Sequence, residues 1–462
     1  MNNWMDCTPA NQLIKDRGGL QVKLAVIADD LTGANDTGVQ FAKQGFRTVV
    51  LFAGTQLQPL HLNEDVVVMN SDSRGLEQEE AYEAVFKIAM HSRKLGVSKI
   101  FKKIDSTMRG NIGLEIDAVM DAFQFETAFI VPAFPKSDRI TIGGYHFVNG
   151  VLIENTELAQ DPVCPVNESY LPTLLQSQSK RKVELLSISD VRKGKKHLSE
   201  LMNKLASEKI PKLIVVDATT DSELKMIVEA TRNLENDFLW AGSAGIAYHL
   251  FDTGQAEEEL GKAEIKDRPP VLAVAGSVNS IIDHQIRNLK EKHHVEEIVL
   301  SPEEFFYEDR KKREIENVVT IGQDLLKKGD LVVTTNRERE AICRVKELQR
   351  RFGLSNFDVG QTIAKSIGMI AARLIGSVPV CGVILTGGDI AGATCKVLKG
   401  DGIRVIGEVE AGIPYGKLFG GPYDGMPIVT KAGAFGTAQA LSKSLQTITQ
   451  VYALDDKNKL TQ

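Results

Sequence analysis

The chain has 462 residues, of which 43% are hydrophobic and 25% are charged, as is ordinary for a globular protein. Its formal net charge of −6 does not indicate the basic surface that binds nucleic acid. No apolar run approaches the ~20 residues that span a bilayer. The length exceeds that of one ordinary core, so we expect two domains.

The cysteines are scattered along the chain, with no CxxC pair and no metal-ligand spacing. They are Cys7, Cys164, Cys343, Cys381 and Cys395. An odd number of isolated thiols favours a reducing compartment over a disulfide framework. Residues 1–21 lack the apolar core of a secretory signal, so we interpret them as an N-terminal tail. These features predict a cytoplasmic protein.

Short β-branched runs alternate with segments of helical periodicity, which predicts βαβ units and mostly parallel sheets. In the first half the expected strands are 24–30, 48–53, 65–73, 99–107, 127–134, 213–218 and 238–243. A polar and charged segment at 253–269 then meets Pro269 and Pro270, and we place the join between domains in this segment, near residue 265. In the second half the expected strands are 271–277, 296–301, 330–336, 382–389, 403–409 and 426–436.

The predicted fold class is therefore α/β, with two α/β domains that each contain a largely parallel sheet flanked by helices. We expect a tail at 1–21, a first domain at 22–262 and a second domain at 263–450. Ligands of open α/β sheets bind at the carboxyl ends of the strands, so polar residues there are candidates for a site.

Asp29 and Asp30 end the first expected strand and precede a turn that contains Gly33. Two adjacent carboxylates repel each other, so a cation, a sugar hydroxyl or a proton is expected beside them. One of them could instead simply cap the following helix, and the segment by itself leaves both interpretations open.

Arg74 closes a polar run, Asn70 to Arg74, at the end of the expected strand 65–73. Its planar guanidinium suits a carboxylate or a phosphate, although an ion pair with a neighbouring aspartate would explain it as well.

The segment 102–111, KKIDSTMRGN, gathers the most charge at any strand end. Alternation along the strand sends Lys103 and Asp105 to one face and Lys102 to the other. Cations crowded at a strand end are costly unless an anion is bound, so we expect a polar pocket for a small hydroxylated anion such as a sugar acid. His146, in the Gly- and Pro-rich loop 132–150, is assigned no catalytic role.

The second half contains Gly-rich turns between strand and helix at 272–280, 384–398 and 431–436. Such turns let backbone N–H groups approach a phosphate, and the helix N-terminus favours its charge. Asp389 could hold a magnesium ion or cap its helix. The chain has no GxxxxGK[ST] sequence and no GxGxxG after the first strand, which excludes a P-loop and weakens a Rossmann dinucleotide site.

ADDLTGANDTG at 28–38, Asp72-Ser73-Arg74, KKIDSTMRGN at 102–111 and TGGDIAGAT at 386–394 resemble, in order and spacing, the four-carbon acid sugar kinase family. The resemblance extends from about Val22 to about Leu441. It implies an ATP-dependent kinase that phosphorylates the terminal hydroxyl of a tetronate, with D-threonate or D-erythronate favoured over 3-oxo-tetronate.

The resemblance also implies site residues, with the sugar acid in the first domain, ATP in the second and the active site in the interdomain cleft. The substrate ligands would be Asp30, Arg74, Lys102, Lys103, Ile104 and Asp105. The ATP ligands would be Ser277, Thr386, Gly387, Gly388, Asp389 and Gly433. Asp30 or Asp105 would orient or deprotonate the attacking hydroxyl. Magnesium is expected with ATP, but no metal ligand is assigned.

Two alternatives stay open from the sequence. A sugar-acid dehydrogenase or aldolase could use the same anion pocket, although the dinucleotide fingerprint and a metal-ligand cluster are missing. A non-catalytic sugar-acid-binding protein would not need the Gly-rich turns of the second half. The expected partners are a sugar acid and ATP, with no nucleic acid and no membrane, and a homodimer is left open.

Overall fold

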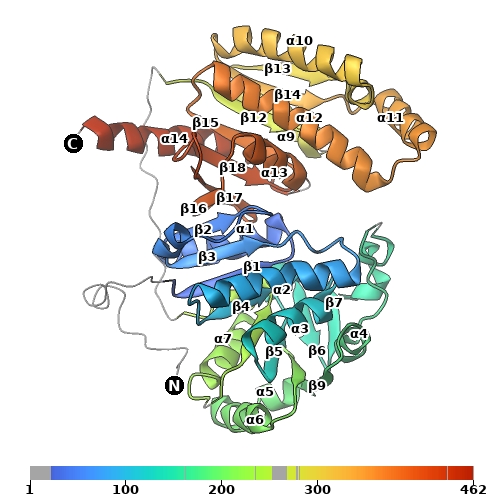
Figure 1. Ribbon diagram of the computed structural model, residues 1–462, viewed down its shortest axis with the longest axis vertical. Helices are drawn as coiled ribbons and strands as arrows, with labels where there is room; N and C mark the ends of the chain where they lie inside the picture. The colour runs from blue at the N-terminus through green and yellow to red at the C-terminus, as the bar shows by residue number, and fades with distance from the viewer. Residues whose placement is uncertain are drawn as a thin grey trace. The chain divides into compact units, whose positions relative to one another are not determined.

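The computed structural model describes residues 22–161, 163–234, 236–251, 268–276, 279, 281–433 and 435–460. The chain divides into two compact units, Met1–Ala256 and Glu257–Gln462 (Figure 1). The predicted tail at 1–21 and the predicted domain boundary at 262–263 lie outside the described residues, and both stay predictions. No helix in the described part of the chain is long and apolar enough to cross a membrane.

The first unit is built on a parallel sheet with the strand order β2-β3-β1-β4-β11-β5-β10-β9. Its strands are β1 (Leu24–Ala28), β2 (Thr48–Leu51), β3 (Val66–Asn70), β4 (Ile100–Lys103), β5 (Thr127–Val131), β9 (Lys182–Leu186), β10 (Lys212–Val216) and β11 (Leu239–Gly242). The central strands are buried over their whole length, as LAVIA in β1 shows. Such continuous apolar runs are typical of parallel strands covered by helices on both faces.

Helices connect these strands, with α2 packed against α3 and α1 against α8. The helices are α1 (Leu31–Ala42), α2 (Gln78–Lys94), α3 (Ile112–Phe123), α4 (Leu171–Gln178), α5 (Ile188–Val191), α6 (Lys195–Ser207), α7 (Asp221–Ala230) and α8 (Ala244–Ala247). A separate antiparallel sheet follows β5 and consists of β6 (Arg139–Ile142), β7 (Tyr145–Val148) and β8 (Val151–Leu152).

The second unit has a mixed sheet with the order β13-β14-β12-β15-β18-β17-β16, in which β17 pairs antiparallel with both β16 and β18 and the other pairs of this order are parallel. Its strands are β12 (Val271–Ala275), β13 (Val295–Leu300), β14 (Asp330–Thr335), β15 (Gly382–Thr386), β16 (Gly402–Glu410), β17 (Ile413–Phe419) and β18 (Pro427–Lys431). The largely parallel character of both sheets is as predicted.

Helices cover both faces of this second sheet. They are α9 (Ile281–Lys292), α10 (Glu308–Leu326), α11 (Arg339–Phe352), α12 (Asn356–Ser377), α13 (Gly388–Val397) and α14 (Ala440–Leu460). One core joins α9 and α14 to alternate residues of the strands, among them Ala275, Ile384 and Val429. Leu331 points to the opposite face, where α10 and α12 lie.

The α/β fold class is confirmed, and the differences from the predicted elements are local. The expected strand 382–389 ends at Thr386, because α13 already begins at Gly388. Three features of the fold were not predicted: β9, β17 and the small sheet of β6 to β8. Their sequences carry glycine, proline or charged residues within short strands, which weakens the alternation that identifies a strand. The expected active site in the interdomain cleft stays a prediction.

Candidate active site

The carboxyl ends of three neighbouring strands of the first unit bring the predicted polar residues together. In the strand order β3-β1-β4, Ala28 is paired with both Asn70 and Lys103. Because parallel strands end at the same edge of a sheet, the segments that follow these three residues lie side by side there.

Asp30 begins α1 and also belongs to this polar cluster. Its backbone is extended, and its Oδ1 accepts the N–H of Gly33 at 2.8 Å, which is an N-cap. A Cβ on Gly33 would lie 2.7 Å from Asp30 Oδ1 and 2.9 Å from Lys103 Nζ, so a larger residue would require one or both of these side chains to shift. Asp30 is therefore a helix cap and a member of the polar cluster at once.

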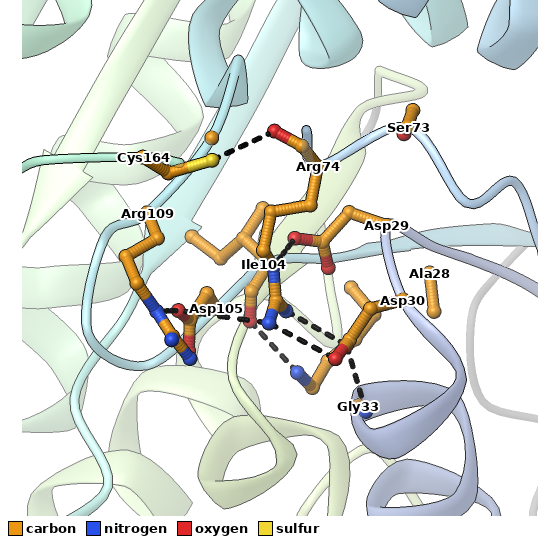
Figure 2. A network of polar contacts seen from close by, with 12 residues as sticks. Ala28, Asp29, Asp30, Gly33, Ser73, Arg74, Ile104, Asp105, Arg109 and Cys164 are labelled. Atoms are coloured by element: carbon orange, nitrogen blue, oxygen red, sulfur yellow. Dashed lines mark hydrogen bonds and ion pairs between the residues drawn. The ribbon is translucent and has the colours of Figure 1, made fainter. Parts of the chain in front are cut away.

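Arg74 lies between the two adjacent carboxylates (Figure 2). Its Nε donates to Asp29 Oδ2 at 2.7 Å, while Nη1 and Nη2 donate to the two carboxylate oxygens of Asp30 at 2.9 and 2.7 Å. The bidentate pair with Asp30 is the strong form of an arginine–carboxylate contact. The structure therefore shows the ion pair between Arg74 and a neighbouring aspartate that the sequence left open. This ion pair is part of a larger network.

Asp105 extends this network on the other side of Arg74, with 4.0 Å between its Oδ2 and Arg74 Nη1. The same oxygen accepts hydrogen bonds from Arg109 Nε at 2.6 Å and from Thr107 Oγ1 at 2.7 Å. Arg109 also reaches Asp161 Oδ2 at 3.4 Å. Asp105 Oδ1 accepts the backbone N–H of Thr107 at 3.2 Å, so Asp105 accepts three hydrogen bonds in all, the same number as Asp30.

Lys102 and Lys103 point to opposite faces of the sheet, as the alternation predicts. Lys102 is completely buried, and its Nζ forms an ion pair with Glu115 at 2.7 Å. Lys103 is 4% exposed, and its Nζ donates to the backbone carbonyl of Ile104 at 2.9 Å. Among the described residues no carboxylate lies within ion-pair distance of Lys103, but its charge favours the ionised forms of the nearby Asp29, Asp30 and Asp105.

The three aspartates differ in pKa because their surroundings differ. Burial raises the pKa of Asp30 above its ordinary value, and the charge of Asp29 adds to this effect although Arg74 opposes it. Burial acts in the same direction on Asp29, but Arg74 and Lys102 outweigh it and lower the pKa. For Asp105 the charges of Arg74 and Arg109 overcome burial and hold the pKa far below its usual range.

Two residues near this cluster were not identified from the sequence. Glu115, in α3, neutralises Lys102 and accepts a hydrogen bond from Ser73 Oγ at 2.8 Å. Asp161 accepts the backbone N–H groups of Val163 and Cys164 and so shapes the loop beside Arg74. Neither position carried a signal, because each is an acidic residue in a segment without a motif.

His146, on β7, is completely buried and contacts the loop that follows β4. Its Nε2 is 2.8 Å from the carbonyl oxygen of Ser106, and its Nδ1 is 3.0 Å from Thr141 Oγ1. Since a carbonyl only accepts, Nε2 carries the proton and Nδ1 accepts from the threonine hydroxyl. His146 therefore supports the loop after β4.

The second unit presents a comparable edge, at the carboxyl ends of β12, β15 and β18. Thr386 ends β15 and is paired with both Ala275 and Lys431. Gly387 follows with φ of 109° and donates its N–H to the carbonyl of Lys431 at 2.8 Å. Gly388 and Asp389 open α13 and are exposed, and Gly433 follows β18 in a turn. Ser277 lies outside the described residues.

The described residues contain no group of three or more histidine, cysteine, aspartate or glutamate side chains arranged to hold a metal ion. Asp389 places an exposed carboxylate in the first turn of α13, beside the Gly387–Gly388 turn.

Comparison with known proteins associates the two units with two described families. A family model described as a sugar-binding N-terminal domain matches residues 24–250. A model described as a nucleotide-binding C-terminal domain matches residues 272–441. The first includes the Arg74 network, and the second includes the Gly387–Gly388 turn.

Similar proteins over nearly the full length are sugar-acid kinases. A D-threonate kinase of Salmonella typhimurium is 34% identical over 94% of this chain and 100% of its own length. A D-erythronate kinase of Heliobacterium modesticaldum is 31% identical, over 90% of this chain and 95% of its own. A 3-oxo-tetronate kinase of Brucella melitensis is 28% identical, over 90% of this chain and 93% of its own.

Solved structures share the fold. A Haemophilus influenzae protein superposes with a TM-score of 0.72 at 24% identity, covering 92% of this chain and 100% of that one. A Salmonella typhimurium protein described as a putative tRNA synthase superposes with a TM-score of 0.74 at 22% identity, covering 91% and 98%.

Proposed function

The chain belongs to the four-carbon acid sugar kinase family, and we propose that it transfers the γ-phosphoryl group of ATP to the terminal 4-hydroxyl of D-threonate or D-erythronate. The observation that carries the proposal is the polar network of the first unit, in which Arg74 pairs with Asp30 and Lys103 Nζ lies beside the same turn at Gly33. A cation to hold a carboxylate and a carboxylate to hold a hydroxyl are the two requirements of a hydroxy-acid substrate.

We assign the substrate carboxylate to Lys103 and Arg74. Arg74 uses three N–H groups on Asp29 and Asp30, and Lys103 uses one on Ile104, so both retain donors for a ligand. Lys102 is already neutralised by Glu115, and we assign it to the support of the network.

We assign the orientation of the attacking hydroxyl to Asp30 rather than to Asp105. The Asp30 side chain is 23% exposed, against 10% for Asp105, so a ligand reaches it more easily. Its raised pKa also makes it the better proton acceptor, because proton transfer is most efficient when the base has a pKa near the working pH.

The second unit would hold ATP at the edge formed by Thr386, the Gly387–Gly388 turn and Gly433. Mg²⁺ in kinase sites is held by one or two carboxylates together with the phosphates. Asp389 fits that role because its carboxylate is exposed in the first turn of α13, and the ion would neutralise phosphate charge during transfer. A cytoplasmic location stays a prediction.

A 3-oxo-tetronate is the second candidate substrate, because 3-oxo-tetronate kinases cover the same length of chain at lower identity. The Arg74 network would hold either acid, since both share the carboxylate and the terminal hydroxyl.

An ADP-release assay with magnesium-ATP across D-threonate, D-erythronate, L-threonate and 3-oxo-tetronates tests the function. We expect D-threonate or D-erythronate to give the highest kcat/KM and a 4-phosphate monoester as the product seen by ³¹P NMR. A reaction without sugar acid is the control for ATP hydrolysis. ADP release that never depends on a tetronate would refute the proposal and favour a binding-only protein.

A further inference from the structure

Lys431 is a buried lysine of the second unit with no described carboxylate within ion-pair distance. It ends β18 and is 3% exposed. Its Nζ donates to the backbone carbonyls of Ala432 at 3.0 Å and Gly433 at 3.2 Å, and no acidic side chain of the described residues lies within ion-pair distance. A buried ammonium is costly unless it is paired, so this arrangement calls for an anion.

The pKa of Lys431 agrees with this description. Burial lowers it to about 8, and the charge of Glu410, on β16, offsets only part of that effect. Glu410 is itself occupied by Lys443, at 2.7 Å, and by the backbone N–H and hydroxyl of Thr437. The carboxylate whose charge acts on Lys431 therefore already has partners of its own.

Thr386 supplies a second buried polar group beside Lys431. The two residues are register partners in the parallel pair of β15 and β18, so their side chains leave the sheet on the same face, about 4.8 Å apart along the sheet. Thr386 is completely buried, and its Oγ1 has no hydrogen-bond partner among the described residues. A buried hydroxyl without a partner is destabilising, and a ligand that accepts its hydrogen bond would remove that penalty.

The backbone at this edge is arranged for close approach of a ligand. Gly387 has φ of 109°, and its N–H is anchored on the carbonyl of Lys431 at 2.8 Å. The turn that opens α13 is thus fixed relative to the lysine. Lys431 and Thr386 both have a donor to spare on the same face of the sheet, and two neighbouring donors select an oxyanion over a cation or an apolar group.

We propose that Lys431 and Thr386 together bind a phosphate group of the nucleotide, with the ammonium and the hydroxyl donating to phosphate oxygens. The inference rests on the proposed kinase function and specifies which side chains of the second unit meet the phosphates. Under the competing interpretation, Lys431 only holds the carbonyls of Ala432 and Gly433 and contributes nothing to nucleotide affinity.

Calorimetric titration of the full-length protein with magnesium-ADP tests the inference. Lys431→Met keeps the length of the side chain and removes its charge, and we expect it to weaken ADP binding by about 10- to 100-fold. Thr386→Val keeps the branched shape and removes the hydroxyl, and a smaller loss is expected. Lys396→Met is the matched control, because Lys396 is exposed on α13 of the same unit. Circular dichroism checks that each variant is folded.

Proton uptake on binding gives a second measurement that a purely structural lysine would not affect. At pH 8 Lys431 is about half protonated, and a bound phosphate raises its pKa, so ADP binding should take up about 0.5 proton. Titrations in buffers of different ionisation enthalpy measure this number. Lys431→Arg, which stays charged, should bind ADP without that uptake.

The outcomes separate the two proposals. If the wild-type protein binds neither magnesium-ADP nor magnesium-ATP, the kinase function itself fails. If it binds them, and Lys431→Met binds ADP as tightly with the same proton uptake, only the role of Lys431 is refuted. Weaker ADP binding by Lys431→Met together with a loss of proton uptake supports the role of Lys431. Loss of proton uptake alone in a folded Lys431→Arg variant supports it as well.

Discussion

Asp29, Asp30 and Asp105 carry the same side chain, but their neighbours give them different chemistry. Asp29 is 4% exposed and held by Arg74, and Asp105 is held by Thr107 and Arg109. Asp30 is the most exposed of the three, at 23%, and is the one whose pKa is raised among these aspartates. We therefore expect Asp30 to interact with the reacting hydroxyl, while the other two hold the cations in place.

Asp30→Asn tests this difference at the scale of the residue. The amide oxygen can still accept the N–H of Gly33, so the cap of α1 is kept, while the proton acceptor is lost. We expect kcat to fall by about 10²- to 10⁴-fold. The melting temperature should fall as well, because the amide cannot accept both N–H groups of Arg74, so activity is compared at a temperature where the variant is folded.

Asp190→Asn is the matched control for this substitution, because Asp190 has a side-chain exposure of 26% and lies in α5, outside the cluster. Wild-type turnover in the folded Asp30→Asn variant would remove Asp30 from the reaction.

At the scale of the element, the small sheet of β6 to β8 is tied to the loop after β4 through His146. The ring bridges Thr141, on β6, and the carbonyl of Ser106, which follows Asp105. Burial lowers the pKa of His146 to about 4, so the ring is neutral at pH 7 and keeps the tautomer that both bonds require.

This lowered pKa predicts a loss of stability in acid. The unfolded chain takes up the proton at its ordinary pKa of 6.5, whereas the folded protein resists until about 4. The stabilisation is therefore complete above pH 6.5 and is lost as the pH falls toward 4. Between pH 7 and pH 5 this single group should cost about 2 kcal/mol.

His146→Gln should remove that pH dependence and cost about 1–3 kcal/mol at pH 7, because the buried hydrogen bonds are impaired. Urea unfolding followed by fluorescence of the buried Trp240 reports the first unit, since the only other tryptophan, Trp4, lies in the predicted tail.

The control is His197→Gln, at a side chain that is 41% exposed on α6, and it should keep the wild-type slope. An unchanged slope between pH 7 and pH 5 in His146→Gln would show that His146 does not control acid stability.

At the scale of the whole molecule, each unit carries one buried lysine at a strand end without a described acidic partner. Lys103 follows this pattern in the first unit and Lys431 in the second, and each donates to carbonyls of the loop that follows it. We assign the first to a sugar-acid carboxylate and the second to a nucleotide phosphate.

Hydrogen exchange read by mass spectrometry tests this division of ligands. D-threonate should slow amide exchange in the segments 28–37 and 71–75, and magnesium-ADP should slow it in 384–391 and 430–433. Some amides exchange only when the protein is locally open and free of ligand. At a ligand concentration of 100 times Kd, the exchange rate of these amides should fall by about 100-fold. Protection of the first unit by ADP, without any in the second, would contradict the assignment.

The sequence by itself determined the local features of this protein. The alternation of apolar strands and periodic helices predicted the α/β class, because side-chain periodicity is a local property. The polar residues at strand ends predicted which segments carry the chemistry, and alternation along β4 placed Lys102 and Lys103 on opposite faces.

Only the tertiary structure decided how these segments meet. The order β3-β1-β4 places Arg74 against Asp29 and Asp30, residues that are 45 and 44 positions away in the chain. The pairing of β15 with β18 likewise places Thr386 beside Lys431. Strand order follows from packing between distant segments, which no local pattern encodes, and for that reason the sequence left the choice between Asp30 and Asp105 open and did not identify Lys431.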